Sequence, residues 1–306
     1  MGLLDEVLAG LAASPRQLPC KLFYDERGAA LFERITRLDA YYLTRTEIGL
    51  LETHLGAIAA RVGPRARVIE PGSGEGLKTR LLLAALAQPA LYVPIDVSAE
   101  QLARTAAALE QEFAGLQVRP LAADYTGPLR LPAAPRTWQR TLVFFPGSTI
   151  GNFEIDEAER FLGRLGELAG PDALLLLGAD ATQDPNVLLP AYDDPEGVTA
   201  EFNLNLLLHI NDRLGADFDT SGFRHRALWV PARHRMEIQV VATRPQVVTI
   251  AGQRIAFAEG EIVVTEHCHK LPPRVMQELL ARAGWRPLEQ FVGSPQPMTL
   301  WLAVRA

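Results

Sequence analysis

Residues 68–76 read Val68-Ile69-Glu70-Pro71-Gly72-Ser73-Gly74-Glu75-Gly76, an apolar strand that ends in a glycine-rich turn. Short apolar runs alternate with helical stretches on both sides of it, which is the pattern of βαβ units. The turn is not a dinucleotide fingerprint, because its third glycine comes two positions after the second rather than three. No GK[ST] sequence follows to make a P-loop. The stretch therefore predicts an α/β fold with a ligand site at the end of this strand.

The predicted elements follow the same alternation through the first two thirds of the chain. We expect strands at 67–70, 91–96, 116–119, 141–145 and 173–178, and helices at 78–86, 99–113 and 156–168. The second helix begins with Ser98 and Gln101 at the spacing of a capping box. Later elements are a helix at 199–214, several short strands up to 266, a helix at 273–283, and strands at 285–291 and 298–304 that complete the first sheet.

A change of composition and period after Asp180 divides the chain into two predicted domains. Residues 1–180 together with 271–306 form the sheet domain, and its first part, before Arg67, is a largely helical cover. Residues 181–270 form a smaller α+β lobe. A Pro/Ala-rich segment at 131–135 is predicted to be a surface loop.

The composition excludes several classes of protein. The chain has 306 residues, 30 basic and 36 acidic side chains, a net charge of −6 and 48% hydrophobic residues. This apolar share excludes disorder as the main state, and the charge argues against nucleic acid as a partner. Only Cys20 and Cys268 are present, so neither a disulfide framework nor a cysteine-based zinc site is indicated. The acidic N-terminus and the short apolar runs predict no signal peptide and no membrane span, hence a cytoplasmic protein, which we expect to be a monomer.

Acidic residues follow the next two predicted strands. Asp96 ends one strand, where a carboxylate can accept hydrogen bonds from a ribose diol, and Asp124 and Tyr125 follow the next. Together with Gly72, these residues indicate a pocket for S-adenosylmethionine, with the diol on Asp96, the adenine near Asp124 and Tyr125, and the amino acid end near Gly72. The alternative is that both aspartates are ordinary turn or cap residues.

The loop after the fourth predicted strand reads Phe145-Pro146-Gly147-Ser148-Thr149-Ile150-Gly151-Asn152-Phe153. It lacks the Asn/Asp-Pro-Pro-aromatic tetrad that is typical of enzymes that methylate base or amide nitrogens. The amide of Asn152 can donate and accept hydrogen bonds, so it could hold the amine and the carboxylate of an amino acid. The alternative is that Asn152 caps the helix that follows.

Several further segments carry a specific resemblance. These are Lys21-Leu22-Phe23-Tyr24-Asp25, Tyr41-Tyr42-Leu43-Thr44-Arg45-Thr46-Glu47, Gly72-Ser73-Gly74 with Lys78-Thr79-Arg80, Gly147 to Asn152, Ala191-Tyr192-Asp193-Asp194, Gly197-Val198-Thr199-Ala200 and Phe202-Asn203-Leu204-Asn205. From Lys21 to the last strand, in register, the chain resembles the L-histidine Nα-methyltransferases of ergothioneine biosynthesis. The resemblance implies a Rossmann-like class I methyltransferase sheet with a smaller substrate-binding lobe. It also implies transfer of three methyl groups from S-adenosylmethionine to the α-amine of histidine, giving hercynine.

The resemblance also implies roles for particular residues. The cofactor would be held by Gly72, Lys78, Asp96, Asp124 and Tyr125. The amine and the carboxylate of the amino acid would be held by Tyr24, Tyr41, Asn152 and Tyr192, and its imidazole would face Glu266. No dedicated nucleophile is needed, because methyl transfer to a neutral amine depends mainly on positioning. Tyr24 and Phe32 can face the growing alkylammonium, since aromatic rings attract cations.

The strand that carries Glu266 supports its role independently. Alternation along the strand puts Glu266 and Cys268 on one face, and His267 and His269 on the other. The chain departs from the family at three places, since Cys268 replaces the usual Ser, Ile238 replaces Met, and Glu70-Pro71 replaces Leu or Phe before the glycine turn. The first two departures lie beside the substrate side chain and keep another amine open as the substrate.

Other patterns have simpler interpretations. The His267-Cys268-His269 tract looks like a set of metal ligands, but the alternation points the thiol away from both rings, so we expect no metal. Asp193 and Asp194 are expected to be turn and cap residues, and the leucines of 202–210 to be core. A catalytically silent S-adenosylmethionine-binding protein is the remaining alternative, although such a protein would not need an amino acid clamp.

Overall fold

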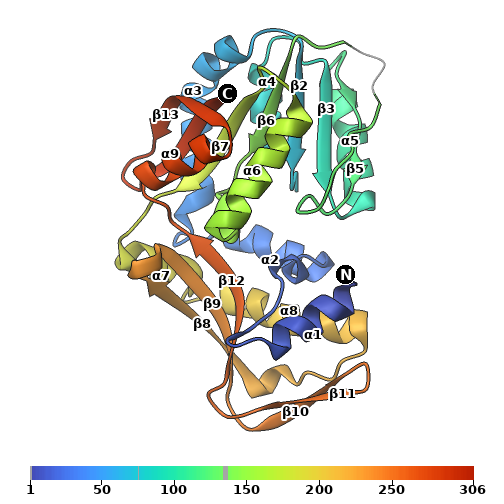
Figure 1. Ribbon diagram of the computed structural model, residues 1–306, viewed down its shortest axis with the longest axis vertical. Coiled ribbons are helices and arrows are strands. Elements are labelled where there is room, and N and C mark those ends of the chain that lie inside the picture. The colour runs from blue at the N-terminus through green and yellow to red at the C-terminus, as the bar shows by residue number, and fades with distance from the viewer. Residues whose placement is uncertain (1, 75, 134–136) are drawn as a thin grey trace. The chain divides into compact units, whose positions relative to one another are not determined.

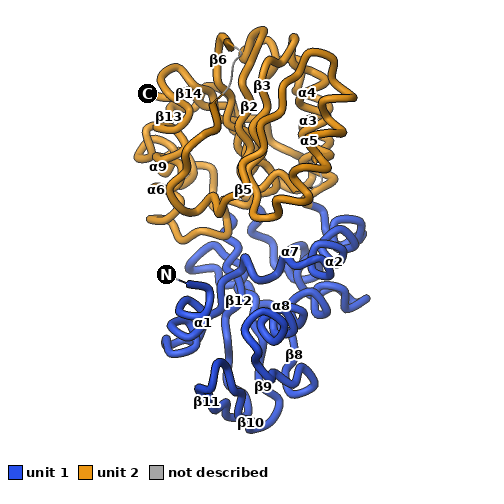
Figure 2. The backbone as a smooth tube through the Cα atoms, turned by 90° about the vertical axis from the view of Figure 1, so that its right-hand side faces the viewer, with its two compact units in different colours: residues 1–42, 182–270 blue, residues 43–181, 271–306 orange. Residues whose placement is uncertain are grey.

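The structure, a computed structural model, describes residues 2–74, 76–133 and 137–306. Glu75 of the glycine turn and part of the predicted 131–135 loop lie outside these residues. The chain forms two compact units: unit 1 comprises residues 1–42 and 182–270, and unit 2 comprises residues 43–181 and 271–306 (Figure 2). Within the described ranges, no helix is both long enough and apolar enough to span a membrane.

Unit 2 contains an eight-stranded sheet in the order β13, β14, β7, β6, β2, β3, β4, with β5 also paired to β3. Its strands are β2 Ala66–Pro71, β3 Leu91–Asp96, β4 Gln117–Val118, β5 Leu121–Ala122, β6 Arg140–Phe145, β7 Leu174–Asp180, β13 Trp285–Val292 and β14 Met298–Arg305. Strands β2 to β7 are parallel, and β14 is antiparallel to both β7 and β13. The strand order reverses between β2 and β6, and the loops of such a switch point form the ligand crevice of open α/β sheets.

Helices cover both faces of this sheet (Figure 1). One face is covered by α6 Ile155–Ala169 and α9 Pro273–Arg282, and the other by α3 Tyr42–Val62, α4 Leu77–Ala85 and α5 Ala99–Glu112. The strands are apolar along almost their whole length because both of their faces are buried. The α/β class predicted from the sequence is confirmed.

Two local predictions for unit 2 need correction. The strand predicted at 116–119 is reduced to the two residues of β4, and an additional short strand, β5, follows Pro120, which has no N–H to donate to the ladder. Ser98 caps α5 by accepting a hydrogen bond from the Gln101 N–H at 3.4 Å. In a capping box, the Gln101 side chain would accept a hydrogen bond from the Ser98 N–H. Here Asp96 Oδ1 accepts it instead, at 3.3 Å.

Unit 1 is built around a four-stranded sheet in the order β1, β12, β9, β8, beside a separate hairpin of β10 and β11. Its strands are β1 Arg16–Gln17, β8 Phe223–Val230, β9 Arg235–Ala242, β10 Gln246–Ile250, β11 Gln253–Phe257 and β12 Ile262–His269. Its helices are α1 Leu3–Ala12, α2 Glu26–Arg37, α7 Pro185–Tyr192 and α8 Val198–Leu214, with short 3₁₀ turns η1 Cys20–Phe23, η3 Thr220–Gly222 and η4 Pro231–Arg233.

The first 42 residues belong to unit 1, whereas the sequence predicts them as part of the sheet domain. The physical reason is strand pairing and helix packing. Strand β1 pairs in parallel with β12, and the Leu18 N–H donates to the Val264 carbonyl at 2.8 Å. Helix α2 packs on α8, where Asn205 donates to Asp25 at 2.8 Å. Asp25 and Asn205 are 180 residues apart in sequence, and the partners of β1 and β12 are further apart still, so no local pattern could indicate these contacts.

Candidate functional site

The glycine turn after β2 lies against an aromatic ring. Gly72 has a φ of +68°, and a Cβ at this position would lie 3.3 Å from Tyr125 Cε1. The Gly72 N–H donates to the carbonyl of Ile95 at 2.7 Å, which ties the turn to β3. The structure therefore brings together two of the residues predicted to bind the cofactor, at the carboxyl end of the parallel strands.

Asp96 and Asp124 both make local turn contacts. Asp96 Oδ1 accepts from the Ser98 N–H, and Asp124 Oδ1 accepts from the N–H and the hydroxyl of Thr126 at 2.9 and 2.6 Å. The turn role that the sequence left open is therefore present. A carboxylate has about four acceptor positions, so a turn contact does not by itself exclude a role in ligand binding. Asp124 follows β5, which pairs with the end of β3 at Asp96.

Lys78 lies in the first turn of α4 and forms an ion pair with Glu47 of α3. The Glu47 carboxylate is fully buried, and both of its oxygens lie 2.9 Å from the Gly147 nitrogen. No role for Glu47 was predicted from the sequence. Its signal was nonetheless present, because it falls on the apolar stripe of α3, whose other members are Leu43, Leu50, Leu51, Leu55, Ile58 and Val62.

Asn152 ends the 3₁₀ turn η2 Thr149–Asn152, in the loop that follows β6. The interpretation of Asn152 as the cap of the next helix is wrong, because the N-cap of α6 is Glu154, paired with Glu157 in a capping box. Ser148 in the same loop has a φ of +58° and is buried. Such a conformation is costly for a residue with a side chain and persists only where the surroundings hold it.

In unit 1, four of the predicted substrate residues form one continuous series of aromatic contacts. The ring centroids of Tyr24 and Phe32 are 5.8 Å apart, those of Phe32 and Tyr41 are 6.3 Å apart, and those of Tyr41 and Tyr192 are 6.3 Å apart. Phe202 of α8 packs against both Tyr24 and Phe32. Tyr24 is 45% exposed, so one end of this series is accessible to solvent.

Strand β12 carries the two residues predicted to face the substrate side chain. Cys268 Sγ lies 3.0 Å from the Tyr192 hydroxyl, while the rings of His267 and His269 lie 6.3 Å apart. His267 reaches Glu237 at 3.5 Å. The predicted alternation of the thiol and the two imidazoles is confirmed. The thiol contacts Tyr192, so it also belongs to the surroundings of that hydroxyl.

Lys270, just beyond β12, was missed by the sequence analysis. It is completely buried, its Nζ donates to the Tyr192 hydroxyl at 2.6 Å, and it lies 4.9 Å from the centre of that ring. Burial raises the pKa of the Glu266 carboxyl to about 7, and the positive charge of Lys270 partly opposes this rise. Burial likewise raises the pKa of the Tyr192 phenol. The strand therefore presents a carboxyl group that can be charged or neutral near pH 7.

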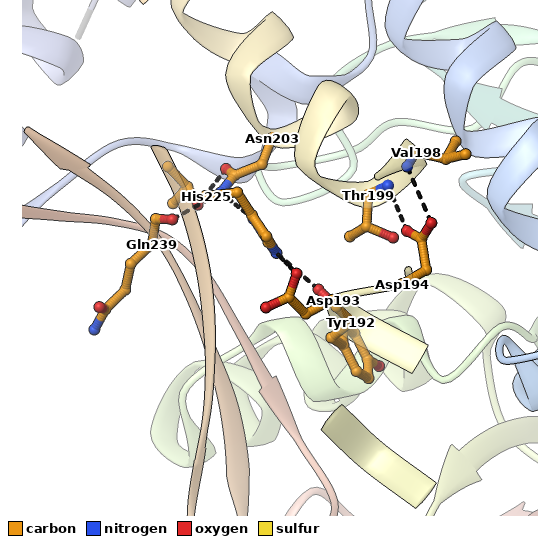
Figure 3. Close-up of polar contacts among 9 residues, drawn as sticks. Tyr192, Asp193, Asp194, Val198, Thr199, Asn203, His225 and Gln239 are labelled. Carbon is orange, nitrogen blue, oxygen red and sulfur yellow. Dashed lines mark hydrogen bonds and ion pairs between the residues drawn. The ribbon is translucent and has the colours of Figure 1, made fainter. Parts of the chain in front are cut away.

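A buried polar network holds the backbone of Tyr192 (Figure 3). The Asn203 amide donates to His225 Nδ1 at 2.8 Å and to the Gln239 carbonyl at 2.9 Å. His225 Nε2 lies 2.9 Å from the Tyr192 carbonyl, which requires this nitrogen to carry the proton. Burial lowers the pKa of His225, which favours the same neutral form. The network connects α7, α8, β8 and β9 around one predicted substrate residue.

The remaining predictions for unit 1 concern helix α8 and metal binding. Asp194 accepts from the N–H groups of Val198 and Thr199 at 3.0 and 2.7 Å, so its predicted role as a cap is confirmed (Figure 3). Of the leucines of 202–210 expected to be core, Leu206 and Leu207 are fully buried, whereas Leu204 and Leu208 are only partly buried. In the part of the chain that the structure describes, no group of three His, Cys, Asp or Glu side chains could hold a metal ion.

The twelve predicted site residues fall into two sets. Unit 2 holds Asn152 and the five cofactor residues Gly72, Lys78, Asp96, Asp124 and Tyr125, and unit 1 holds Tyr24, Phe32, Tyr41, Tyr192, Glu266 and Cys268. Unit 2 has the open α/β sheet that binds ligands at its switch point, with a glycine turn after β2 and a carboxylate at the end of β3. The family that matches the chain makes it an S-adenosylmethionine-dependent methyltransferase.

The particular family follows from comparison with known proteins. Residues 3–305 match the family described as histidine-specific methyltransferase, SAM-dependent, and the chain belongs to this family. It is 39% identical to the histidine N-alpha-methyltransferase of Mycolicibacterium smegmatis, over 98% of this chain and 94% of that protein. It is 37% identical to the protein of the same name from Mycobacterium tuberculosis, over 100% and 95%. Ergothioneine biosynthesis protein 1 of Neurospora crassa is 38% identical over 72% of this chain and 27% of that protein.

Proposed function

We propose that this protein transfers three methyl groups from S-adenosylmethionine to the α-amine of L-histidine, giving hercynine as a step of ergothioneine biosynthesis. The observation that carries the proposal is the match of almost the whole chain to the histidine-specific family. The matches to the two proteins named histidine N-alpha-methyltransferase also extend over 94% and 95% of the length of those proteins. We keep a monomer and a cytoplasmic location as predictions.

In this proposal the cofactor binds at the carboxyl end of the parallel strands of unit 2. Asp96 accepts from the ribose diol, while Asp124 and Tyr125 contact the adenine. Lys78 pairs with the carboxylate of the cofactor, and Gly72 allows the backbone to approach the amino acid end. The closeness of Tyr125 to Gly72, whose added Cβ would lie 3.3 Å from the ring, and the pairing of Asp96 with β5 support one common site for these groups.

The amino acid is held by Tyr24, Tyr41, Asn152 and Tyr192, and its imidazole pairs with Glu266. A carboxyl group with a pKa of about 7 suits this ligand, since the pKa of a free imidazole is close to the same value. An ionised Glu266 accepts from a ring N–H, and a protonated Glu266 donates to a ring nitrogen. Either combination gives a hydrogen bond that an aliphatic or phenyl side chain cannot make.

The chemistry needs a neutral amine lone pair in line with the methyl group and the sulfonium. The protein contributes mainly by positioning, for which about 7–11 kcal/mol is available in ideal cases. Tyr24 and Phe32 lie in contact and can attract the alkylammonium formed after each transfer, each ring contributing about 0.5–2 kcal/mol. This attraction would retain the intermediates while the spent cofactor is exchanged.

A second candidate function is methylation of another amine by the same arrangement. Two features favour keeping it. Ile238, where related proteins were expected to carry Met, pairs directly with Glu266 across β9 and β12 and is buried. Cys268, which also departs from the family pattern, contacts the Tyr192 hydroxyl. Both departures therefore lie next to residues that are assigned to the substrate.

The test is to incubate the purified protein with S-adenosylmethionine and an equimolar mixture of free amino acids, and to identify the products by mass spectrometry. Histidine gaining three methyl groups supports the proposal. Methylation of a different component would support the second candidate. Calorimetric binding of S-adenosylhomocysteine without any methylated product would favour a silent cofactor-binding protein.

Glu266→Gln tests the assignment of the imidazole. The amide keeps one contact with the ring but loses the charge, so we expect kcat/KM for histidine to fall by about 5- to 30-fold, which is about 1–2 kcal/mol. The value for a poor substrate such as phenylalanine should change less than twofold. An equal fall for both substrates would mean that Glu266 acts in chemistry or folding and not in recognition.

A further inference from the structure

The Glu47 carboxylate lies at a point where four separate segments of unit 2 meet. It comes from α3, forms an ion pair with Lys78 of α4, and accepts from the Gly147 N–H in the loop after β6. Its own exposure is 0%, and a Cβ at Gly178 of β7 would lie only 1.8 Å from Glu47 Oε1. The glycine therefore provides the space that this carboxylate occupies.

A buried carboxylate is costly unless it is paired and hydrogen-bonded, so its two partners show what it stabilises. Lys78 is the cation expected to hold the carboxylate of the cofactor. Gly147 begins the 3₁₀-containing loop that ends at Asn152, the residue expected to hold the amino acid. Glu47 thus contacts Lys78 directly, and it contacts the start of the loop that carries Asn152 at its end.

The loop between Gly147 and Asn152 needs such a support. Gly147 and Ser148 have consecutive φ values of +87° and +58°, and the second is strained for a residue with a side chain. Ser148 is held by a hydrogen bond from the Asp180 N–H to its Oγ at 3.0 Å and by the Gly151 N–H, which donates to its carbonyl at 2.9 Å. Glu47 provides the corresponding contact at Gly147, where the loop begins.

We propose that Glu47 is a positioning residue that fixes the Lys78 ammonium and the strained loop 147–152 in one geometry. The proposal rests on the function proposed above, because that function assigns the cofactor to Lys78 and the amino acid to Asn152. Glu47 touches neither ligand and acts only through these two groups. Its carboxylate would neutralise part of the Lys78 charge while holding that ammonium at the cofactor pocket.

The first experiment compares Glu47→Gln with Glu47→Ala. The glutamine keeps an acceptor for the Gly147 N–H, so KM for histidine should stay within threefold of the native value. The alanine has no acceptor, and KM should rise at least 20-fold. Equal KM values in the two variants would overturn the proposal, because the carboxylate would then not act through the loop.

The second experiment adds Asn152→Ala to each protein. In the native background this change should raise KM for histidine at least 20-fold, and in the Glu47→Ala background it should add less than twofold, since Asn152 is already displaced. A full additional loss in the double variant would show that the two residues act independently, and the proposal would fail.

The third experiment addresses Lys78 by calorimetric binding of S-adenosylhomocysteine, which needs no turnover. Glu47→Gln should weaken binding at least fivefold in the native background and less than 1.5-fold when Lys78 is already Met. An unchanged or tighter affinity in Glu47→Gln, or the same weakening in both backgrounds, would overturn the role through Lys78. If Glu47→Ala does not fold, this cycle and the Glu47→Gln value of KM still test the proposal.

A matched control is Glu112→Ala, which removes an ion pair with Arg80 in the same unit. Glu112 is 46% exposed, so KM and the cofactor affinity should both stay within a factor of two. The binding cycle also separates this proposal from the proposed function. If histidine is not the substrate, KM is measured with the amine that the product analysis identifies, while the cycle with S-adenosylhomocysteine stands unchanged.

Discussion

Unit 2 and unit 1 assemble their site residues in different ways. In unit 2 the predicted cofactor residues follow consecutive parallel strands, so Gly72, Asp96 and Asp124 come together at one edge because of the sheet topology alone. In unit 1, Tyr24 is linked through Phe32 to Tyr41, and Tyr41 contacts Tyr192. Tyr192 and strand β12 come more than 140 residues later in the sequence. A site that follows strand order can be predicted from local patterns, whereas a site made by long-range packing cannot.

The two units also stabilise their buried charges differently. In unit 2, Lys78 and Glu47 form an ion pair that a backbone N–H completes. In unit 1, the fully buried Lys270 donates to a phenol, and its charge acts on Glu266. Because all five predicted cofactor residues lie in unit 2, changes in unit 1 should spare cofactor binding.

The largest effect that this comparison predicts is for Lys270→Met. The change removes the ammonium that donates to the Tyr192 hydroxyl and the positive charge that acts on Glu266. We expect kcat/KM for histidine to fall at least 100-fold, about 3 kcal/mol, because breaking a buried charged contact is costly. Calorimetric affinity for S-adenosylhomocysteine should stay within threefold.

The control for this change is Arg274→Met, whose side chain is 89% exposed and whose loss should leave both values nearly unchanged. A parallel loss of cofactor affinity in Lys270→Met would contradict the prediction, since a change in unit 1 would then affect binding of the ligand that is assigned to unit 2.

The converse prediction is for Asp96→Ala in unit 2. Losing a charged acceptor for two hydroxyls should weaken S-adenosylhomocysteine binding by about 2–3 kcal/mol. The proposed substrate residues of unit 1 are untouched, so KM for histidine at saturating cofactor should change less than threefold. Unchanged cofactor affinity in calorimetry would remove the assignment of the diol to Asp96.

A third prediction uses the buried carboxyl of Glu70 in unit 2. Burial raises the pKa of Glu70 to about 7, although Tyr92 and Thr79 donate to it at 2.6 and 2.7 Å. Because this pKa is higher in the folded state than in the unfolded state, the contribution of Glu70 to stability is present below about pH 4.5. It is lost as the pH rises to about 7. Over this pH range, the ionisation of Glu70 alone lowers the free energy of unfolding by about 3 kcal/mol.

Glu70→Gln should therefore reduce the difference in unfolding free energy between pH 5 and pH 8 by about 2–3 kcal/mol, measured by denaturant titration at each pH. The glutamine oxygen keeps an acceptor for Tyr92. Exposed Glu112→Gln is the control, with an expected change below about 0.5 kcal/mol. An undiminished pH dependence in Glu70→Gln would mean that Glu70 is ionised throughout this range.

The smallest expected effect is for Cys268→Ser in unit 1. A hydroxyl is a better hydrogen-bonding group than a thiol, so it should interact more strongly with the Tyr192 hydroxyl and with an imidazole beside Glu266. We expect affinity for histidine to improve by about 0.5–1.5 kcal/mol and cofactor affinity to stay the same. Weaker binding of histidine would indicate that the pocket is shaped for the larger sulfur atom.

The sequence alone determined the sheet of unit 2, the positions of its helices, and the loops that carry Gly72, Asp96 and Asn152. It could do so because apolar period, glycine turns and cap residues act within a few positions of one another. Even there, the cap of α6 and the break at Pro120 changed the local detail.

Only the tertiary structure decided that residues 1–42 join unit 1, that Glu47 reaches Lys78 and Gly147, and that Lys270 is buried against Tyr192. The physical reason is that pairing and burial depend on which distant segments meet. The ion pair of Lys78 with Glu47, the strained backbone of Ser148 and the raised pKa of Glu266 arise only once those segments pack against one another.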